Sequence, residues 1–69
     1  MVEIFKTNIA DENTAKTVLS ELAIHLPNSY INFDLEDCDN ILRIENCSIN
    51  VNLVVSILNT NGFNCELLQ

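Results

Sequence analysis

The chain has 69 residues, of which ten are acidic and three are basic, so its formal net charge is −7. So few cations cannot neutralise a phosphate backbone, which excludes direct nucleic-acid binding, and the same charge disfavours anionic membrane surfaces. At this length we expect a single domain over residues 1–69. No stretch approaches the ~20 apolar residues of a membrane span, and the first residues lack a signal-peptide pattern, so we expect a cytoplasmic chain.

The first half of the chain predicts a strand, a helix and a second strand. Residues 2–8 are rich in β-branched and aromatic side chains, which is typical of a strand. Cap-type residues at 11–14 then open a helix, which Pro27 ends. From Tyr30 onward apolar and polar side chains alternate, which predicts a half-buried strand with Ile31, Phe33 and Leu35 turned inward. The helix presents one apolar stripe, made of Ala15, Val18, Leu19, Leu22 and Leu26.

The second half of the chain predicts a returning strand, a second helix and a last strand. A polar turn at 37–40 joins the previous strand to residues 41–45 in a hairpin, with Leu42 and Ile44 facing the core. Capping candidates at 46–50 precede a helical stripe that stops at Asn61-Gly62. Residues 63–67 alternate again, with Phe63, Cys65 and Leu67 turned inward. The second stripe comprises Val51, Val54, Val55 and Leu58, with Leu53 and Ile57 expected beside it.

This β-α-β-β-α-β order has few ways to bury its apolar faces. Both helices can cover one face of a single sheet, and right-handed crossovers place the first and third strands at its centre. We therefore expect the α+β ferredoxin-like sandwich, with a four-stranded antiparallel sheet and two helices on one face. Three connections would meet at one end, which we call the loop end: residues 9–14, residues 37–40 and the turn around Gly62.

Two segments of the chain resemble a known family. Lys6-Thr7-Asn8-Ile9, followed by a loop that opens a helix, resembles the heavy-metal-associated domain of copper chaperones and metal-pumping ATPases. The Asn61-Gly62-Phe63 junction is similar to the glycine–aromatic step of that family, and the overall pattern covers nearly the whole chain. The resemblance implies the same scaffold and a docking surface at the loop end.

The metal motif of that family, Met-x-Cys-x-x-Cys, is absent here. Placing Ile9 at the methionine puts Asp11 and Thr14 at the two cysteines. A carboxylate and a hydroxyl cannot replace a dithiolate that holds Cu(I), because this soft ion prefers sulfur. We therefore expect no metal at this loop and no cofactor.

The three cysteines leave one alternative open. Cys38 in the hairpin turn and Cys65 near the loop end could form a two-thiol metal site, whereas Cys47 belongs to the opposite end. A metal-binding or metal-transfer protein that uses Cys38 and Cys65 is therefore the alternative function. The inward alternation around Cys65 argues instead that this thiol belongs to the core.

Catalysis has little support in the sequence, so we do not expect an enzyme. His25, the only histidine, comes near the end of the first helix, and no serine has a convincing base near it. Gly62 is the only glycine, which excludes a glycine-rich phosphate loop. A small-metabolite-sensing regulatory domain is a second alternative, supported by analogy of fold alone.

A protein-interaction module is the leading functional hypothesis. The acidic loop end suggests a docking patch for a protein with a basic surface. Surplus apolar residues on the polar side of their strands suggest self-association as a homodimer. The expected docking patch comprises Asp11, Glu12, Asp37, Asp39 and Phe63, and the expected self-association residues are Tyr30, Ile41 and Leu68.

Overall fold

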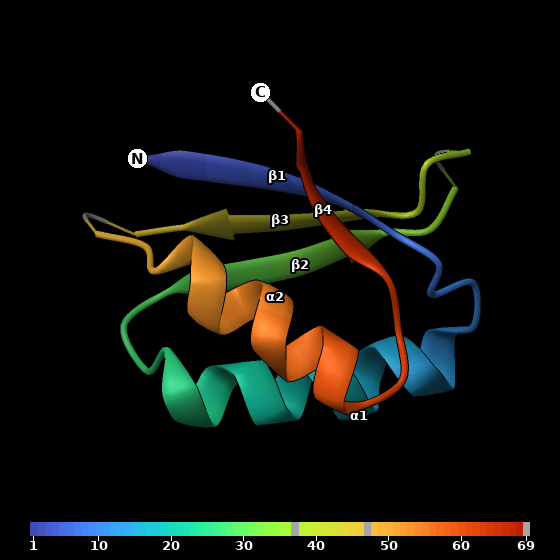
Figure 1. The fold of residues 1–69 in the computed structure, drawn as a ribbon, viewed down its shortest axis with the longest axis horizontal. Helices are drawn as coiled ribbons and strands as arrows, with labels where there is room; N and C mark the ends of the chain where they lie inside the picture. Colours follow the sequence, from blue (N-terminus) through green and yellow to red (C-terminus); the bar gives the residue numbers. More distant parts are fainter. Residues whose placement is uncertain (37, 47, 69) are drawn as a thin grey trace.

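The computed structural model describes residues 1–36, 38–46 and 48–68. Two residues of the sequence predictions, Asp37 and Cys47, therefore lie outside the described residues. Six elements follow one another in the predicted order (Figure 1). They are β1 (Val2–Thr7), α1 (Glu12–His25), β2 (Tyr30–Asp34), β3 (Ile41–Glu45), α2 (Val51–Thr60) and β4 (Cys65–Leu68).

The four strands form one sheet in the order β2-β3-β1-β4, and every neighbouring pair is antiparallel. β1 and β3 are central, as expected from right-handed crossovers. Both helices lie on the same side of the sheet (Figure 1). This is the ferredoxin-like sandwich, and the predicted fold class is confirmed. No helix in the described part of the chain is long and apolar enough to cross a membrane.

Helix α1 begins at a capping aspartate and ends before a proline. The side chain of Asp11 caps its first turn by accepting a hydrogen bond from the Thr14 amide. At the other end the Leu26 amide donates to the carbonyl of Leu22, and Pro27 follows directly. Its stripe of Ala15, Val18, Leu22 and Leu26 is buried against the sheet, while Leu19 is half-buried.

Helix α2 begins at an asparagine cap and ends before a glycine. The Asn50 side chain accepts from the Leu53 amide at 3.1 Å. At the end of the helix Gly62 has φ +89°, a left-handed conformation that side chains disfavour, and the Phe63 amide donates back to the Leu58 carbonyl. The glycine–aromatic step of the sequence is therefore a helix-ending turn.

The apolar face of α2 is turned differently from the prediction. Ile57, expected beside the stripe, is buried in the core with Val54 and Leu58, whereas Val55 is only half-buried. The placement of Ile57 was therefore wrong. Residues 54, 57 and 58 follow the i, i+3, i+4 spacing of one helix face, and β-branched residues on two adjoining faces make that choice ambiguous in sequence.

The two faces of the sheet differ, and Ile41 marks the difference. On the helix side Phe5, Leu42 and Ile44 are fully buried, and Ile31, Phe33 and Leu67 pack against them. Ile41 lies on the opposite face, outside that core cluster, yet it is only 7% exposed. Asp34 and Lys6 flank it on the neighbouring strands. Ile41 therefore offers little surface for the self-association expected of it.

Candidate interaction surface

The loop end is held together by hydrogen bonds from the last residues of β1. The Thr7 amide donates to the carbonyls of Asp39 and Asn40 in the hairpin turn, each at 3.3 Å. The Asn8 side chain accepts from the Asn64 amide at 2.9 Å, just before β4 begins. The three connections therefore meet at one end of the molecule, as predicted (right side of Figure 1).

The side chain of Thr7 fixes the loop that follows β1. Its hydroxyl donates to the Asn40 carbonyl at 2.7 Å and accepts from the Ile9 amide at 3.2 Å. Ile9, the residue at the methionine position of the resembled family, is 1% exposed and belongs to the core. The segment that carries the resemblance therefore closes the fold at this end, because its polar groups bond to one another and its apolar side chain is buried.

The two positions that hold the metal in the resembled family form a helix cap here. A carboxylate oxygen of Asp11 accepts from the Thr14 amide at 2.9 Å and from the Thr14 hydroxyl at 3.1 Å. These residues do not fit Cu(I), because both are oxygen donors already engaged with each other. The Asp11 carboxylate thus satisfies one of the free backbone amides in the first turn of α1, that of Thr14.

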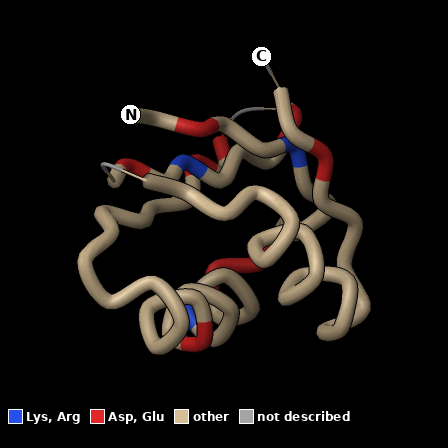
Figure 2. The backbone as a smooth tube through the Cα atoms, turned by 60° about the vertical axis from the view of Figure 1, so that its left-hand side comes forward, with Lys and Arg blue, Asp and Glu red and all other residues tan. Residues whose placement is uncertain are grey.

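The described residues of the predicted docking patch lie at the loop end, and their surroundings differ. Asp11 is the helix cap, Asp39 lies 3.8 Å from the Lys6 ammonium, and Phe63 is half-buried against the core. Glu12 is exposed in the first turn of α1. Acidic residues are spread over the sheet, the loops and α1 (Figure 2). In residues 1–36, 38–46 and 48–68, no three Asp, Glu, Cys or His side chains converge as metal ligands would.

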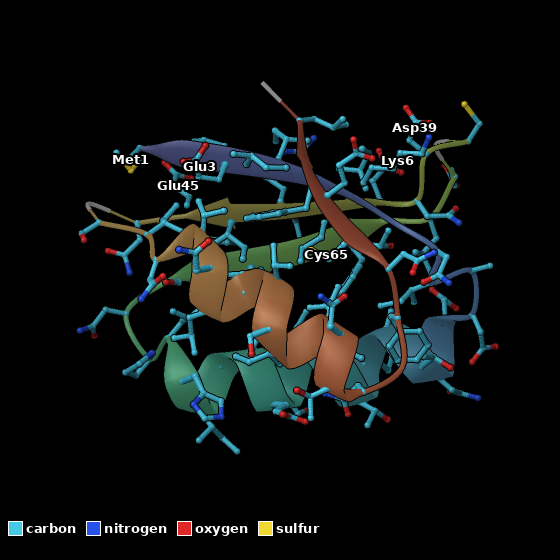
Figure 3. All side chains as sticks on the ribbon, viewed as in Figure 1. Met1, Glu3, Lys6, Asp39, Glu45 and Cys65 are labelled. Carbon is cyan, nitrogen blue, oxygen red and sulfur yellow. The ribbon has the colours of Figure 1, made fainter. Side chains whose placement is uncertain are left out.

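The two described cysteines have different surroundings. Cys65 packs against the core from β4, and burial raises the pKa of its thiol from 9.0 to about 11. It lies on the helix side of the sheet (Figure 3). Cys38 is exposed in the hairpin turn. The Cys65 thiol is therefore protonated at neutral pH, whereas soft metals bind the thiolate. Cys65 is half-buried beside the core cluster, on the side that its alternation predicted.

Exposed apolar side chains gather at the end opposite the loop end. Met1, Val2 and Tyr30 are 68%, 48% and 75% exposed, and they are three of the four large apolar side chains exposed in the described residues. Glu45 on β3 pairs with Val2 on one side and with Tyr30 on the other. The carbonyl of Met1 accepts from the Asn46 amide at 3.0 Å, which fixes the first residue beside β3.

We call this surface the apolar corner: Met1, Val2 and Tyr30, with the carboxylate of Glu45 between the last two. Figure 3 shows Met1, Glu3 and Glu45 together at the start of β1. Leu68, also expected to support self-association, is half-buried on β4 opposite Ile4 and lies farther along the same sheet face. The sequence predicted Tyr30 as exposed, but it gave no reason to group this residue with Met1 and Val2, because their proximity depends on strand order.

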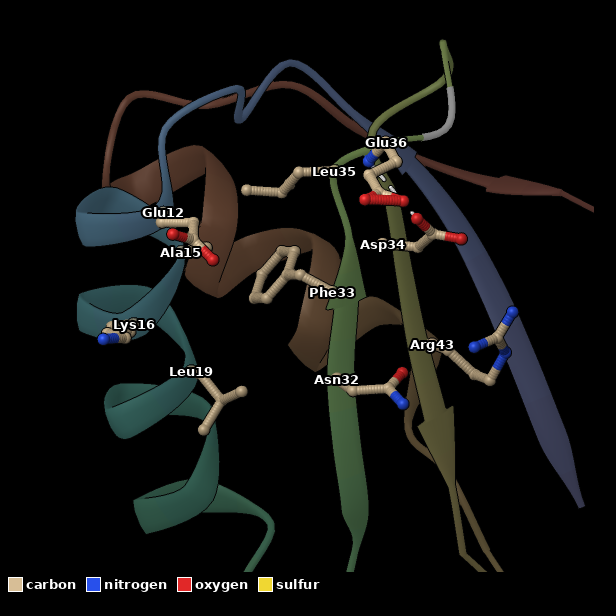
Figure 4. A pocket seen from close by; sticks show the side chains of 10 residues that line it. All are labelled: Glu12, Ala15, Lys16, Leu19, Asn32, Phe33, Asp34, Leu35, Glu36 and Arg43. Carbon is tan, nitrogen blue, oxygen red and sulfur yellow. Dashed lines mark hydrogen bonds between the residues drawn. The ribbon is translucent and has the colours of Figure 1, made fainter.

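A groove lies between α1 and β2. Its volume is about 530 Å³, within the range of small-molecule sites, but it is open along the edge of β2 (Figure 4). Apolar side chains from both elements and five charged residues line it. Its lining residues are Glu12, Ala15, Lys16, Leu19, Asn32, Phe33, Asp34, Leu35, Glu36 and Arg43. The alternation of the sequence indicated that Phe33 and Leu35 turn toward the helix. The groove itself could not be predicted, because its width depends on how α1 packs against β2.

Comparison with known proteins adds no assignment to this geometry. No family model matches the chain, and neither the curated proteins nor the solved structures gave a match.

Proposed function

We propose that this chain is a non-catalytic protein-interaction module that binds a partner with a basic surface at the apolar corner. The observation that carries the proposal is the exposure of Val2 and Tyr30 on either side of Glu45, on the sheet face that neither helix covers, with the exposed Met1 at the end of β1 beside them. In this proposal the chain is a relative of the heavy-metal-associated domain that has kept the scaffold without the dithiolate site.

The physical argument has an apolar part and an electrostatic part. Tyrosine and methionine are enriched in protein interfaces, because they bury a large apolar area with few polar groups to desolvate. The net charge of −7 favours encounter with a cationic surface, and Glu45 provides a carboxylate at the centre of the corner. The partner we propose therefore has an apolar patch bordered by lysine or arginine.

The two alternatives from the sequence remain proposals with weaker support. Metal binding by Cys38 and Cys65 requires the buried thiol to lose its proton against a raised pKa. A competition titration with Cu(I) under reducing conditions separates this alternative, since tight binding abolished by Cys65→Ser would favour it. Metabolite sensing is supported by the volume of the groove beside β2 alone, and a thermal-shift screen addresses it.

Affinity capture with matched variants tests the proposed function. Wild type, Tyr30→Ala, Glu45→Lys and Glu36→Lys are used as baits in extracts of the source cells. Glu36→Lys is the control, because it changes the net charge as much as Glu45→Lys does, and its carboxylate lies at the end of the groove beside the hairpin. We expect proteins that wild type and Glu36→Lys retain and that Tyr30→Ala and Glu45→Lys lose by at least about tenfold.

The same experiment can contradict the proposal in two ways. All four baits retaining the same proteins equally would show that the apolar corner does not bind them. Proteins lost with Glu36→Lys but kept by Tyr30→Ala would place the interface at the loop end, where the sequence first suggested it.

A further inference from the structure

Strand β2 has a free edge. It pairs with β3 on one side, and no other strand in the described chain lies on its other side. Alternate residues of an edge strand direct their N–H and C=O groups away from the sheet, where another strand can pair with them. In Figure 4 this edge faces the viewer, with Phe33 and Leu35 turned toward α1 and Asn32 and Asp34 turned to the opposite face.

This edge carries few of the devices that prevent strand addition. Between Tyr30 and Asp34 there is no lysine, no proline and no interruption of the register with β3. The groove beside it is lined by the half-buried side chains of Leu19 and Phe33 and by the buried Ala15. The opposite edge, β4, has four residues, one fewer than β2. β2 is therefore the better-formed free edge.

We propose that a second copy of this chain pairs its β2 antiparallel to this β2, so that two four-stranded sheets join into one of eight strands. The two-fold axis passes beside Asn32, the middle residue of the strand. Directly opposed residues then lie on the same face of the joined sheet. Asn32 faces Asn32 of the second copy, Ile31 faces Phe33, and Tyr30 faces Asp34.

Charge and polarity favour this register. On the helix side, Ile31 and Phe33 extend the apolar surface across the seam. On the other side the Tyr30 hydroxyl can donate to the Asp34 carboxylate of the second copy, and the two Asn32 amides can donate to and accept from each other. A register centred on Asp34 would oppose two carboxylates, which is unfavourable.

The charges along the groove also favour a second copy over a strongly basic peptide. Three carboxylates, of Glu12, Asp34 and Glu36, line it together with the cations of Lys16 and Arg43. A groove with nearly balanced charge offers a polybasic segment little net attraction. A second copy brings the same mixture of signs, so each cation can approach a carboxylate of the other chain.

Salt gives this interface a distinctive behaviour. Each copy carries a net charge of −7, so the two chains repel each other over long range. Screening weakens that repulsion, so added salt should strengthen the dimer, whereas it should weaken binding of a basic partner at the apolar corner. The inference goes beyond the proposed function, and the two surfaces share only Tyr30, which lies in β2 and in the apolar corner.

The substitution Asn32→Asp tests the inference. Within one chain the new carboxylate lies opposite Arg43, so the fold is retained, but at the two-fold axis it faces its own copy. Asn52→Asp, an exposed residue of α2, makes the same change in net charge away from β2. Sedimentation equilibrium from micromolar to millimolar concentration, at low and high salt, gives the dissociation constant of each. Amide hydrogen exchange identifies the strand involved.

We expect wild type and Asn52→Asp to dimerise, with tighter association in high salt and with concentration-dependent protection of β2 amides. Asn32→Asp should raise the dissociation constant at least tenfold. A wild-type chain that stays monomeric at millimolar concentration would overturn the inference. So would a dimer that Asn32→Asp leaves unchanged, or one that protects β4 instead of β2. None of these outcomes depends on whether a basic partner binds the apolar corner, because the measurements use the purified chain alone and Asn32→Asp leaves Met1, Val2, Tyr30 and Glu45 in place.

Discussion

The two ends of this molecule use their side chains in opposite ways. At the loop end Thr7, Asn8 and Asp11 are all hydrogen-bonded within the chain, and Ile9 is buried. At the apolar corner Met1, Val2 and Tyr30 expose large apolar surfaces. Polar groups that bond internally stabilise a fold, whereas exposed apolar groups gain free energy when a partner covers them. The side chains of the loop end therefore stabilise the fold, and those of the apolar corner are available to a partner.

The comparison also bears on the resemblance to metal-binding domains. In the resembled family the loop end holds the ion, but here the two positions of its thiolates are occupied by a helix cap. The same arrangement of strands and helices can thus contribute stability here, whereas in the resembled family it supports metal binding. This division predicts that substitutions at the loop end change stability and that substitutions at the apolar corner change binding.

The largest effect is expected from Ile9→Ala. Removing this buried side chain should lower the free energy of unfolding by about 3 kcal/mol, from lost burial and the cavity left behind. Urea denaturation followed by circular dichroism measures it. Because a small domain has little stability to lose, Ile9→Val is the graded variant, with an expected loss of about 1 kcal/mol.

For comparison, Tyr30→Ala at the corner should change the free energy of unfolding by less than about 0.5 kcal/mol, since its side chain is largely exposed. An Ile9→Ala protein as stable as Tyr30→Ala would remove the distinction between the two ends.

A smaller effect is expected from Asp11→Ala. Loss of the helix cap should cost about 1 kcal/mol, because the Thr14 amide loses its acceptor. Asp11→Ser keeps a capping oxygen and should recover most of the loss, which the same urea titration measures. Equal losses for both variants would contradict a capping role for the side chain at position 11.

A pH-dependent effect is expected at Cys65. Burial raises the pKa of this thiol to about 11, so the folded state favours the protonated form. Its contribution to stability is complete below pH 9, the ordinary thiol value, and is lost as the pH rises from 9 to 11. The free energy of unfolding of wild type should therefore fall relative to that of Cys65→Val as the pH rises from 9 to 11. A difference that is independent of pH would contradict the burial of this thiol.

The order of the helices and strands could be predicted from short segments of the sequence. The burial of single side chains depended on how these elements pack. The bounds of β3 and the caps of both helices follow from residues that carry their own conformational preferences, such as Asp11 and Gly62. The burial of Ile57 and Ile41 depends on how α2 is rotated and on which strands flank β3, and neither is encoded locally. The apolar corner likewise depends on packing. Tyr30 was identified from its strand, but its grouping with Met1 and Val2 required the order of strands.

The central claim is that the apolar corner binds a partner and the loop end does not. Amide hydrogen exchange of the chain with and without a partner isolated by the affinity capture tests it most directly. We predict slower exchange at residues 1–3, at Tyr30 and around Glu45, with residues 9–14 and 38–40 unchanged. Slower exchange at the loop-end residues, with residues 1–3 and Tyr30 unaffected, would contradict the account.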